Sequence, residues 1–382
     1  MLVYFIPVTW LYILSNLKIK KYKNLIEKVT VILLGIFLCT TYFNGSDWRQ
    51  YELMYKYASF EGISSFYAEK GFYLYMLLFK ALRFDFWQFF LITKLWCFYI
   101  FYLYMKENSK NLFFTLMLFY VYMSLYLFID CPLRNLIAMA IFLFSIKYLL
   151  NKKYFKYYLL TFIAFSFHHS AIFMILLPFV ELLVKLNKWI LITTVLIFNI
   201  IFLDQGFVIN LINIFPESIS YRVLGYMNSK YFEQSFFSLG NLEKFFIILM
   251  ILWNKKKFIQ ENKNGKFLIS MLLIYYLFYK LSFTIDILSR FSITYFYIFY
   301  ILNIILFINI FKKYTNKRII MFIFFIYGNL MITKLILLSY PKYIPYTSYL
   351  NYIFKEKPSY EIRKSYNDLK YEKKFGKKYI QK

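Results

Sequence analysis

Arg134 and His168 are the two residues whose types and positions point most directly to chemistry. They lie near opposite ends of a hydrophobic stretch, residues 128–173, in which Lys152 and Lys153 separate two apolar segments. If both segments are helices, the lysine turn brings Arg134 and His168 back to the same side of a membrane. A guanidinium at the edge of a long apolar segment is costly unless it meets water, a partner or a ligand, so such groups are functional candidates. The alternative is an arginine that only extends to the membrane interface.

These residue types suit phosphate binding and proton transfer. Arginine keeps its charge and presents a fixed fork of donors that matches phosphate oxygens. Histidine titrates near neutral pH and can accept a proton from a hydroxyl group, which makes His168 the first candidate for a general base. A capping or sugar-orienting role at a helix junction is the alternative. Three carboxylates are further candidates for the base: Asp47, which could instead pair with Arg49, Glu69 and Glu243.

Two more arginines could contribute to anion binding. Arg290 stands at the predicted outer end of an apolar segment, four residues after Asp286, with which it could form an ion pair instead. Arg222 lies in a long polar loop, where a plain surface position also accounts for it.

Aromatic residues are frequent in the loop at residues 44–70. Trp48, Tyr51 and Tyr55 share one face of a helix at their spacing, and they could stack on sugar rings. A membrane-lying amphipathic helix shows the same spacing, and we favour that interpretation for this face.

Composition indicates an all-α polytopic membrane protein. The chain has 382 residues, of which 61% are hydrophobic and 25% aromatic, more apolar surface than a soluble domain can bury. The net charge of +27 comes from lysines in short breaks between apolar segments. This distribution is typical of orientation signals and not of a nucleic-acid surface, so we expect no nucleic-acid partner.

The apolar segments predict about twelve spans in one transmembrane domain, residues 1–340. The predicted spans are residues 2–16, 29–43, 86–105, 111–129, 132–150, 155–168, 170–184, 188–204, 241–254, 267–285, 290–311 and 319–340.

A further apolar piece, residues 71–84, is short for a span. The lysine breaks all fall on the cytoplasmic side only if this piece does not cross, so we expect it to be re-entrant or interfacial, beside an outward-facing cavity. Loops 44–70 and 204–240 would then lie outside. The basic tail, residues 341–382, would also lie outside against the usual charge rule, and its side is left open.

No metal site or disulfide framework is indicated. Cys39, Cys97 and Cys131 show no CxxC spacing and fit plain packing. The predicted outer loops contain no DxD motif or cluster of metal ligands, so we expect neither a metal nor a cofactor.

Several short motifs follow one another in a fixed order along the chain. They are G-x-D-x-x-x-Y at Gly45, Asp47 and Tyr51; E-x-G-F at Glu69, Gly71 and Phe72; R-x-x-x-A at Arg134 and Ala138; S-x-x-Y-L at Ser145 to Leu149; and A-x-x-x-H-x-S-A at Ala164, His168, Ser170 and Ala171. This ordered set resembles the EpsG-type family of Wzy-like polysaccharide polymerases. The resemblance covers roughly residues 2–184 closely, with a weaker match around Arg290.

This resemblance implies polymerisation of polyprenyl-diphosphate-linked oligosaccharide repeat units by a GT-C-like enzyme. The reaction would take place on the outer face of the bacterial cytoplasmic membrane, between a lipid-linked donor and acceptor, with a chain-length regulator as a further candidate partner. Arginine, without a metal, would stabilise the leaving diphosphate. We expect catalytic roles for His168, Asp47 and Glu69, and substrate-binding roles for Arg134, Arg290, Arg222 and Tyr51.

Two other functions stay open. A flippase or transporter of the same lipid-linked sugars should show internal repeats, and no repeat of matching motifs is evident between the two halves. A membrane acyltransferase that modifies a glycan usually needs a histidine in a tunnel facing a cytoplasmic donor, whereas His168 is predicted to face outward.

Overall fold

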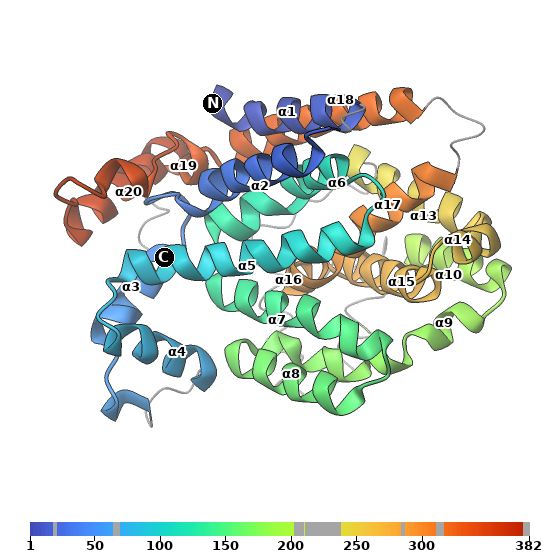
Figure 1. Ribbon diagram of the computed structural model, residues 1–382, viewed down its shortest axis with the longest axis horizontal. Coiled ribbons are helices and arrows are strands. Elements are labelled where there is room, and N and C mark those ends of the chain that lie inside the picture. Colours follow the sequence, from blue (N-terminus) through green and yellow to red (C-terminus); the bar gives the residue numbers. More distant parts are fainter. Residues whose placement is uncertain are drawn as a thin grey trace. The chain divides into compact units, whose positions relative to one another are not determined.

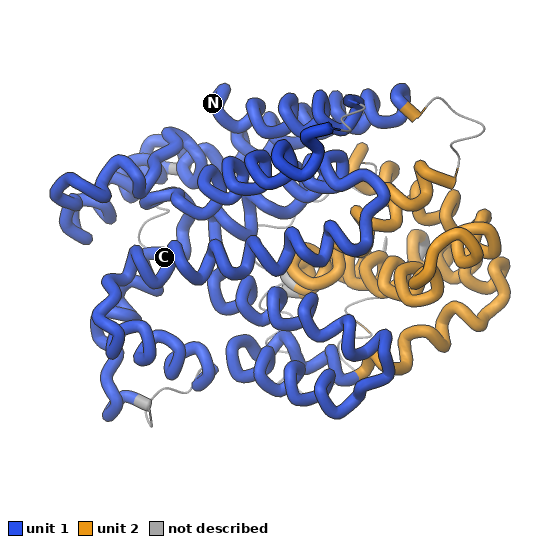
Figure 2. Tube along the Cα trace, in the orientation of Figure 1, with its two compact units in different colours: residues 1–175, 318–382 blue, residues 176–317 orange. Residues whose placement is uncertain are grey.

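The computed structural model describes residues 1–17, 21–63, 69–201, 210, 238–283, 287–310 and 317–376. In this part of the chain the regular structure is helical, no β-strand is found, and an isolated antiparallel bridge joins Thr41 and Ser348. The predicted all-α class is therefore confirmed. The chain divides into two compact units, residues 1–175 with 318–382 and residues 176–317, which Figure 2 distinguishes by colour.

The first unit contains the N-terminal helices and the C-terminal tail. In Figure 1 α1 and α18 lie side by side, and the stacked rings of Tyr12 and Phe325 join them at a centroid distance of 4.4 Å. The helices of this unit are η1 (Leu2–Tyr4), α1 (Phe5–Asn16), α2 (Lys23–Cys39), α3 (Trp48–Tyr57), η2 (Glu61–Ile63), α4 (Lys70–Ala81), α5 (Phe86–Asn108), α6 (Leu112–Phe119), η3 (Tyr120–Asp130, a π-helix), α7 (Leu133–Leu150), α8 (Tyr154–Phe167), α18 (Lys317–Leu338), α19 (Tyr340–Tyr343), η7 (Tyr349–Tyr352) and α20 (Tyr360–Phe375).

The second unit begins within η4, a 3₁₀ helix that continues the chain from the first unit. Its helices α15 and α17 pack against each other, and α10 packs against α13. The helices are η4 (His169–Phe179), α9 (Glu181–Lys185), α10 (Lys188–Ile201), α13 (Leu239–Trp253), α14 (Lys255–Glu261), α15 (Gly265–Leu281), α16 (Ile287–Phe291), η5 (Ser292–Phe296, a π-helix) and α17 (Tyr297–Ile310).

Five described helical segments are long and apolar enough to cross a membrane: Phe86–Asn108, Leu112–Asp130, Leu133–Leu150, Ser292–Ile310 and Lys317–Leu338. A sixth span is present if His169–Lys185 and Lys188–Asn199, which meet at 115°, act as one broken span. These helices support a multi-pass membrane protein. The count of about twelve and the GT-C-like arrangement stay predictions, because other predicted spans form shorter helices, such as the 17-residue α2 and α15.

Helix α4 covers most of the short apolar piece at residues 71–84. Its 12 residues extend about 18 Å, whereas the hydrocarbon core of a bilayer is about 30 Å thick. The helix packs against α3 and α8. Gly71 makes the contact with α8 so close that a Cβ atom added there would lie 2.9 Å from the carbonyl carbon of Ser166.

Helices α7 and α8 form a hairpin. The turn between them contains Lys152 in the left-handed region, at φ 55°, followed by Lys153. The two helices contact each other along their lengths. The predicted turn is therefore confirmed, and it places Arg134, at the start of α7, and His168, just after α8, at the same end of the hairpin.

The C-terminal tail folds back on the loop that follows α2. Arg363 of α20 donates two hydrogen bonds, of 2.6 and 2.7 Å, to the carboxylate of Glu52 in α3. Asp368 of α20 forms an ion pair of 2.8 Å with Arg49 of α3. The tail therefore packs against the loop at residues 44–57, and we expect both on the same side of the membrane, which the sequence left open.

The aromatic face of α3 is buried inside the protein. Trp48, Tyr51 and Tyr55 are between 1% and 5% exposed. Tyr55 stacks on Phe89 of α5, and the guanidinium of Arg363 lies 5.2 Å from the ring centre of Trp48. The prediction that this face lies in the headgroup layer is wrong, because α5 and the distant tail helix cover it.

Candidate functional site

Three separate segments bring Glu69, Arg134 and His168 together. The Glu69 carboxylate, just before α4, pairs with Arg134 Nη1 at 2.5 Å, and its other oxygen lies 3.7 Å from His168 Nδ1. The backbone N–H of His169 donates to that same oxygen at 3.4 Å. The side chain of Glu69 is 6% exposed, whereas those of Arg134 and His168 are 25% and 22% exposed. The carboxylate is thus enclosed, while the two basic groups remain partly accessible.

Only some of the hydrogen-bond donors of the Arg134 guanidinium have partners in the described part of the chain. Nη1 is engaged with Glu69, and its Cζ lies 5.9 Å from the ring centre of Tyr51. Its buried Nε has no hydrogen-bond partner in the described part of the chain. A buried donor without an acceptor is costly, so this edge of the fork is suited to an acceptor that the protein itself does not supply.

His168 lies at the junction between two helices and belongs to neither. Helix α8 ends at Phe167, and the backbone of His168 is extended, with φ −154° and ψ 126°. His168 and His169 therefore do not follow each other on one continuous helix. The extended residue lets the chain turn from α8 into η4.

The ring of His168 caps the start of η4. Its Nδ1 accepts the backbone N–H of Ser170 at 3.1 Å and lies 2.9 Å from Ser170 Oγ. Ser170 Oγ in turn donates to Asn135 Oδ1 at 3.0 Å, which links the junction to α7. Because an N–H points at Nδ1, the neutral ring in this arrangement carries its proton on Nε2. The predicted capping role is therefore present in the structure.

Tyr51 lies near the carboxylate of Asp47 and the guanidinium of Arg134. Burial raises the pKa of Tyr51 well above its ordinary value, and Asp47 adds to this rise while Arg134 opposes it. The phenol is therefore neutral at physiological pH and is able to donate a hydrogen bond.

Asp47 belongs to a neighbouring polar cluster that the sequence analysis missed. Ser46 Oγ lies 3.0 Å from Asp47 Oδ1 and 2.7 Å from Asp130 Oδ1. Lys342 of α19 pairs with Asp130 Oδ2 at 2.6 Å. Gly45, at φ +78°, allows the loop that carries Ser46 to lie against Asp130, since a Cβ there would lie 2.7 Å from Asp130 Cα. Asp130 could have been identified from the sequence because it is a carboxylate directly after an apolar segment.

The Asp130–Lys342 pair is partly shielded from water. Burial alone would lower the pKa of Lys342, but the Asp130 carboxylate outweighs it and raises that pKa. Lys342 therefore remains charged and fixes the tail to the turn that precedes α7.

The family model of the EpsG family matches residues 29–348. The chain belongs to the EpsG family. Members of this family are Wzy-like polysaccharide polymerases. No curated protein and no solved structure matches the chain. The EpsG match includes Glu69, Arg134 and His168 and ends before α20.

The remaining predicted site residues of this EpsG chain are not part of the described cluster. The backbone of Arg290 lies in α16, but its side chain is outside the described residues, as are Asp286 and Arg222. The ion pair suggested between Arg290 and Asp286 thus stays a prediction.

Glu243 lies in a buried charged cluster of the second unit. Its carboxylate accepts a hydrogen bond of 2.7 Å from Tyr300 and lies 3.2 Å from Lys244 Nζ. Nearby, Lys280 donates to Asn241 at 2.6 Å. These contacts account for Glu243 as a structural partner of buried lysine and tyrosine.

No group of three or more His, Cys, Asp or Glu side chains that could hold a metal is found among the described residues. Cys39, Cys97 and Cys131 are buried free thiols.

Proposed function

We propose that this EpsG-family protein joins polyprenyl-diphosphate-linked oligosaccharide repeat units into a surface polysaccharide. The reaction is a metal-independent glycosyl transfer on the outer face of the bacterial cytoplasmic membrane. Family membership supports the polymerase class. The observation that carries the proposal is the meeting of Arg134, with its unsatisfied Nε, and His168 around the single enclosed carboxylate of Glu69.

In this proposal Arg134 binds the diphosphate of the donor. The fork of a guanidinium makes two-point contacts with phosphate oxygens, and the charge is present at every physiological pH. The bond between the anomeric carbon and the diphosphate breaks, and the leaving group gains negative charge that Arg134 stabilises.

His168 takes the proton of the acceptor hydroxyl as its oxygen bonds to the anomeric carbon. Nε2 can accept that proton only when the neutral ring carries its proton on Nδ1. The Glu69 oxygen 3.7 Å from Nδ1 is the acceptor for that proton, so the hydrogen bond from Ser170 gives way to one toward Glu69. In this proposal Tyr51 and Asp47 hydrogen-bond sugar hydroxyls.

The test compares His168→Ala and His168→Gln in cells that make the polysaccharide. A polymerase with His168 as base should leave single repeat units on their lipid carrier at the outer face and form no ladder, since general-base catalysis contributes about 10²–10⁴-fold. Glutamine keeps hydrogen bonding but takes no proton. Near-normal ladders with glutamine would make His168 an orienting group.

The same experiment separates the polymerase from a flippase. A flippase variant would trap the precursor on the inner side, and no repeat unit would reach the outer face. That result would overturn the proposed function.

A further inference from the structure

The second unit contains a cavity of about 590 Å³ whose lining is strongly basic. We name it the lysine pocket and define it by the eight residues that line it: Lys188, Trp253, Asn254, Lys255, Lys256, Lys257, Ile259 and Gln260. Four of the eight are lysines and none is acidic. Beside the pocket, the carboxylate of Glu261 lies 4.0 Å from Lys257 Nζ.

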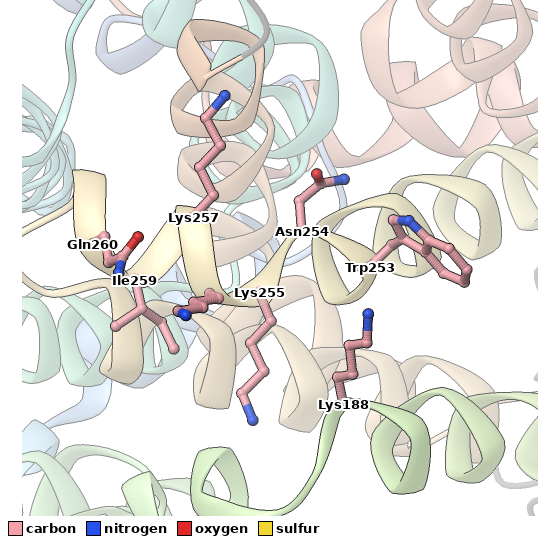
Figure 3. A pocket seen from close by; sticks show the side chains of 8 residues that line it. Lys188, Trp253, Asn254, Lys255, Lys257, Ile259 and Gln260 are labelled. Carbon is pink, nitrogen blue, oxygen red and sulfur yellow. The ribbon is translucent and has the colours of Figure 1, made fainter.

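Two turns of the chain build the lysine pocket. One joins α9 to α10, where Asn187 accepts the backbone N–H of Trp189, and the other joins α13 to α14. Lys255 ties the turns together by donating to the carbonyl oxygen of Leu186 at 2.6 Å. In Figure 3 Lys188 extends from the start of α10 toward the junction that carries Trp253 and Lys255. The pocket is therefore a formed feature of this unit.

The ammonium group of Lys188 lies beside two tryptophan rings. Its Nζ lies 4.9 Å from the ring centre of Trp189 and 5.0 Å from that of Trp253, and these two rings meet edge to face at 5.3 Å. Both tryptophans are more than half exposed. Exposed tryptophan at the end of apolar helices is typical of the membrane–water interface.

Apolar side chains extend from the lysine pocket along the surface of the same helices. Leu186, Ile190 and Met250 are between 42% and 51% exposed. A site with cationic donors at the interface and an apolar surface beside it fits a ligand with a phosphate headgroup and acyl chains. A soluble anion would contact only the cationic donors and would leave the apolar surface unused.

We propose that the lysine pocket binds the headgroup of an anionic phospholipid. Both turns are lysine breaks that the charge rule places on the cytoplasmic side, where anionic lipids are enriched in the membrane leaflet. Lysines of the pocket pair with the lipid phosphate, while Asn254 and Gln260 can donate to headgroup oxygens. This proposal does not rest on the polymerase function.

The experiment titrates the purified full-length protein in detergent with phosphatidylglycerol and counts retained lipids by native mass spectrometry. The variant is Lys188→Gln with Lys256→Gln, because neither ammonium group makes a hydrogen bond within the described part of the chain. Each lysine near an anionic lipid contributes about fivefold in affinity, so the pair should weaken retention roughly thirtyfold. Lys188→Arg with Lys256→Arg keeps both charges and should retain the lipid.

The matched control is Lys152→Gln with Lys153→Gln, which removes two lysines from another predicted cytoplasmic turn and should leave retention unchanged. Phosphatidylcholine, which has no net charge, should bind weakly to every form. Equal retention of phosphatidylglycerol by the pocket variant and the control would overturn the proposal. Displacement of the lipid by millimolar inorganic phosphate would assign the pocket to a soluble anion and would also overturn it.

Discussion

Glu69 and Arg134 form an ion pair across 65 residues of sequence, and the same carboxylate lies beside His168. One enclosed group therefore sets the electrostatic environment of both basic residues of the candidate site. A change at Glu69 should alter the binding of the diphosphate and the transfer of the proton together.

Replacing Glu69 by glutamine should abolish polymer formation. It leaves the partly buried Arg134 without its counter-charge, and loss of one partner of such a pair costs about 3 kcal/mol in the free energy of unfolding. Thermal unfolding and polymer ladders measure the two effects, with Glu107→Gln as an exposed control. In the double variant with Arg134→Gln, the loss of stability should be smaller than the sum of the single losses. A normal ladder from Glu69→Gln would contradict the shared role.

Gly71→Ala should disturb the site although it removes no functional group. The added Cβ would press on the Ser166 backbone at 2.9 Å, which separates α4 from α8 and draws Glu69 away from His168. Overpacking of this kind costs about 1–3 kcal/mol. Ladder assays on equal amounts of protein should show reduced polymer, while the exposed neighbour Lys70→Ala should behave like the parent protein. Unchanged polymer from Gly71→Ala would show that the contact between α4 and α8 can adjust to the added methyl group.

Arg363→Ala should release the tail from α3. The change removes both hydrogen bonds to Glu52 and the contact with Trp48, and it leaves the partly buried carboxylate of Glu52 without its partner at a cost of about 3 kcal/mol. Limited trypsin digestion should then cut α20 faster, and the unfolding temperature should fall. The adjacent exposed Lys364→Ala is the control, and equal digestion of the two variants would count against the docking.

Cysteine labelling should place the tail and the first loop on one side of the membrane. The three native cysteines are buried, so an introduced thiol reports its own position. Phe60→Cys and Ser365→Cys should both react with an impermeant maleimide on intact cells, whereas Lys153→Cys should react only after permeabilisation. Different accessibility at positions 60 and 365 would disprove the shared side.

Lys370 should make the stability of the protein depend on alkaline pH. Its Nζ is buried without a hydrogen-bond partner in the described part of the chain, and burial lowers its pKa from 10.5 to about 8. Between these values the unfolded chain binds more protons, so this lysine's contribution to the free energy of unfolding increases as the pH rises. Thermal unfolding at several pH values in this range should show a smaller increase for Lys370→Met than for the parent. Identical slopes would mean that Lys370 titrates normally.

Much of the candidate site could be predicted from the sequence because its parts are set by local signals. The apolar lengths and the Lys152–Lys153 turn predict a hairpin, and a hairpin returns Arg134 and His168 to one end. The ordered motifs added Glu69. The predicted spans 155–168 and 170–184 already meet beside His168, but the extended backbone of this residue carries no glycine or proline signal.

The environment of α3 could not be predicted in the same way. The spacing of Trp48, Tyr51 and Tyr55 specifies an apolar face but does not specify what covers it. Its cover includes Arg363, 311 residues beyond Glu52 in the chain. Contacts at such separations leave no local pattern, which is also why Lys342 was missed as the partner of Asp130.

The docking of α20 on α3 also limits how many times the chain can cross the membrane. With both ends on one side, the segment between Tyr57 and Tyr340 must cross the membrane an even number of times. Ten of the twelve predicted spans fall in this segment, since residues 2–16 and 29–43 precede it, and ten obeys the rule. A crossing by α4 would make eleven and separate the tail from its partners. Any revision of the count, such as merging the two helices that meet at 115°, must therefore be matched by a second change elsewhere.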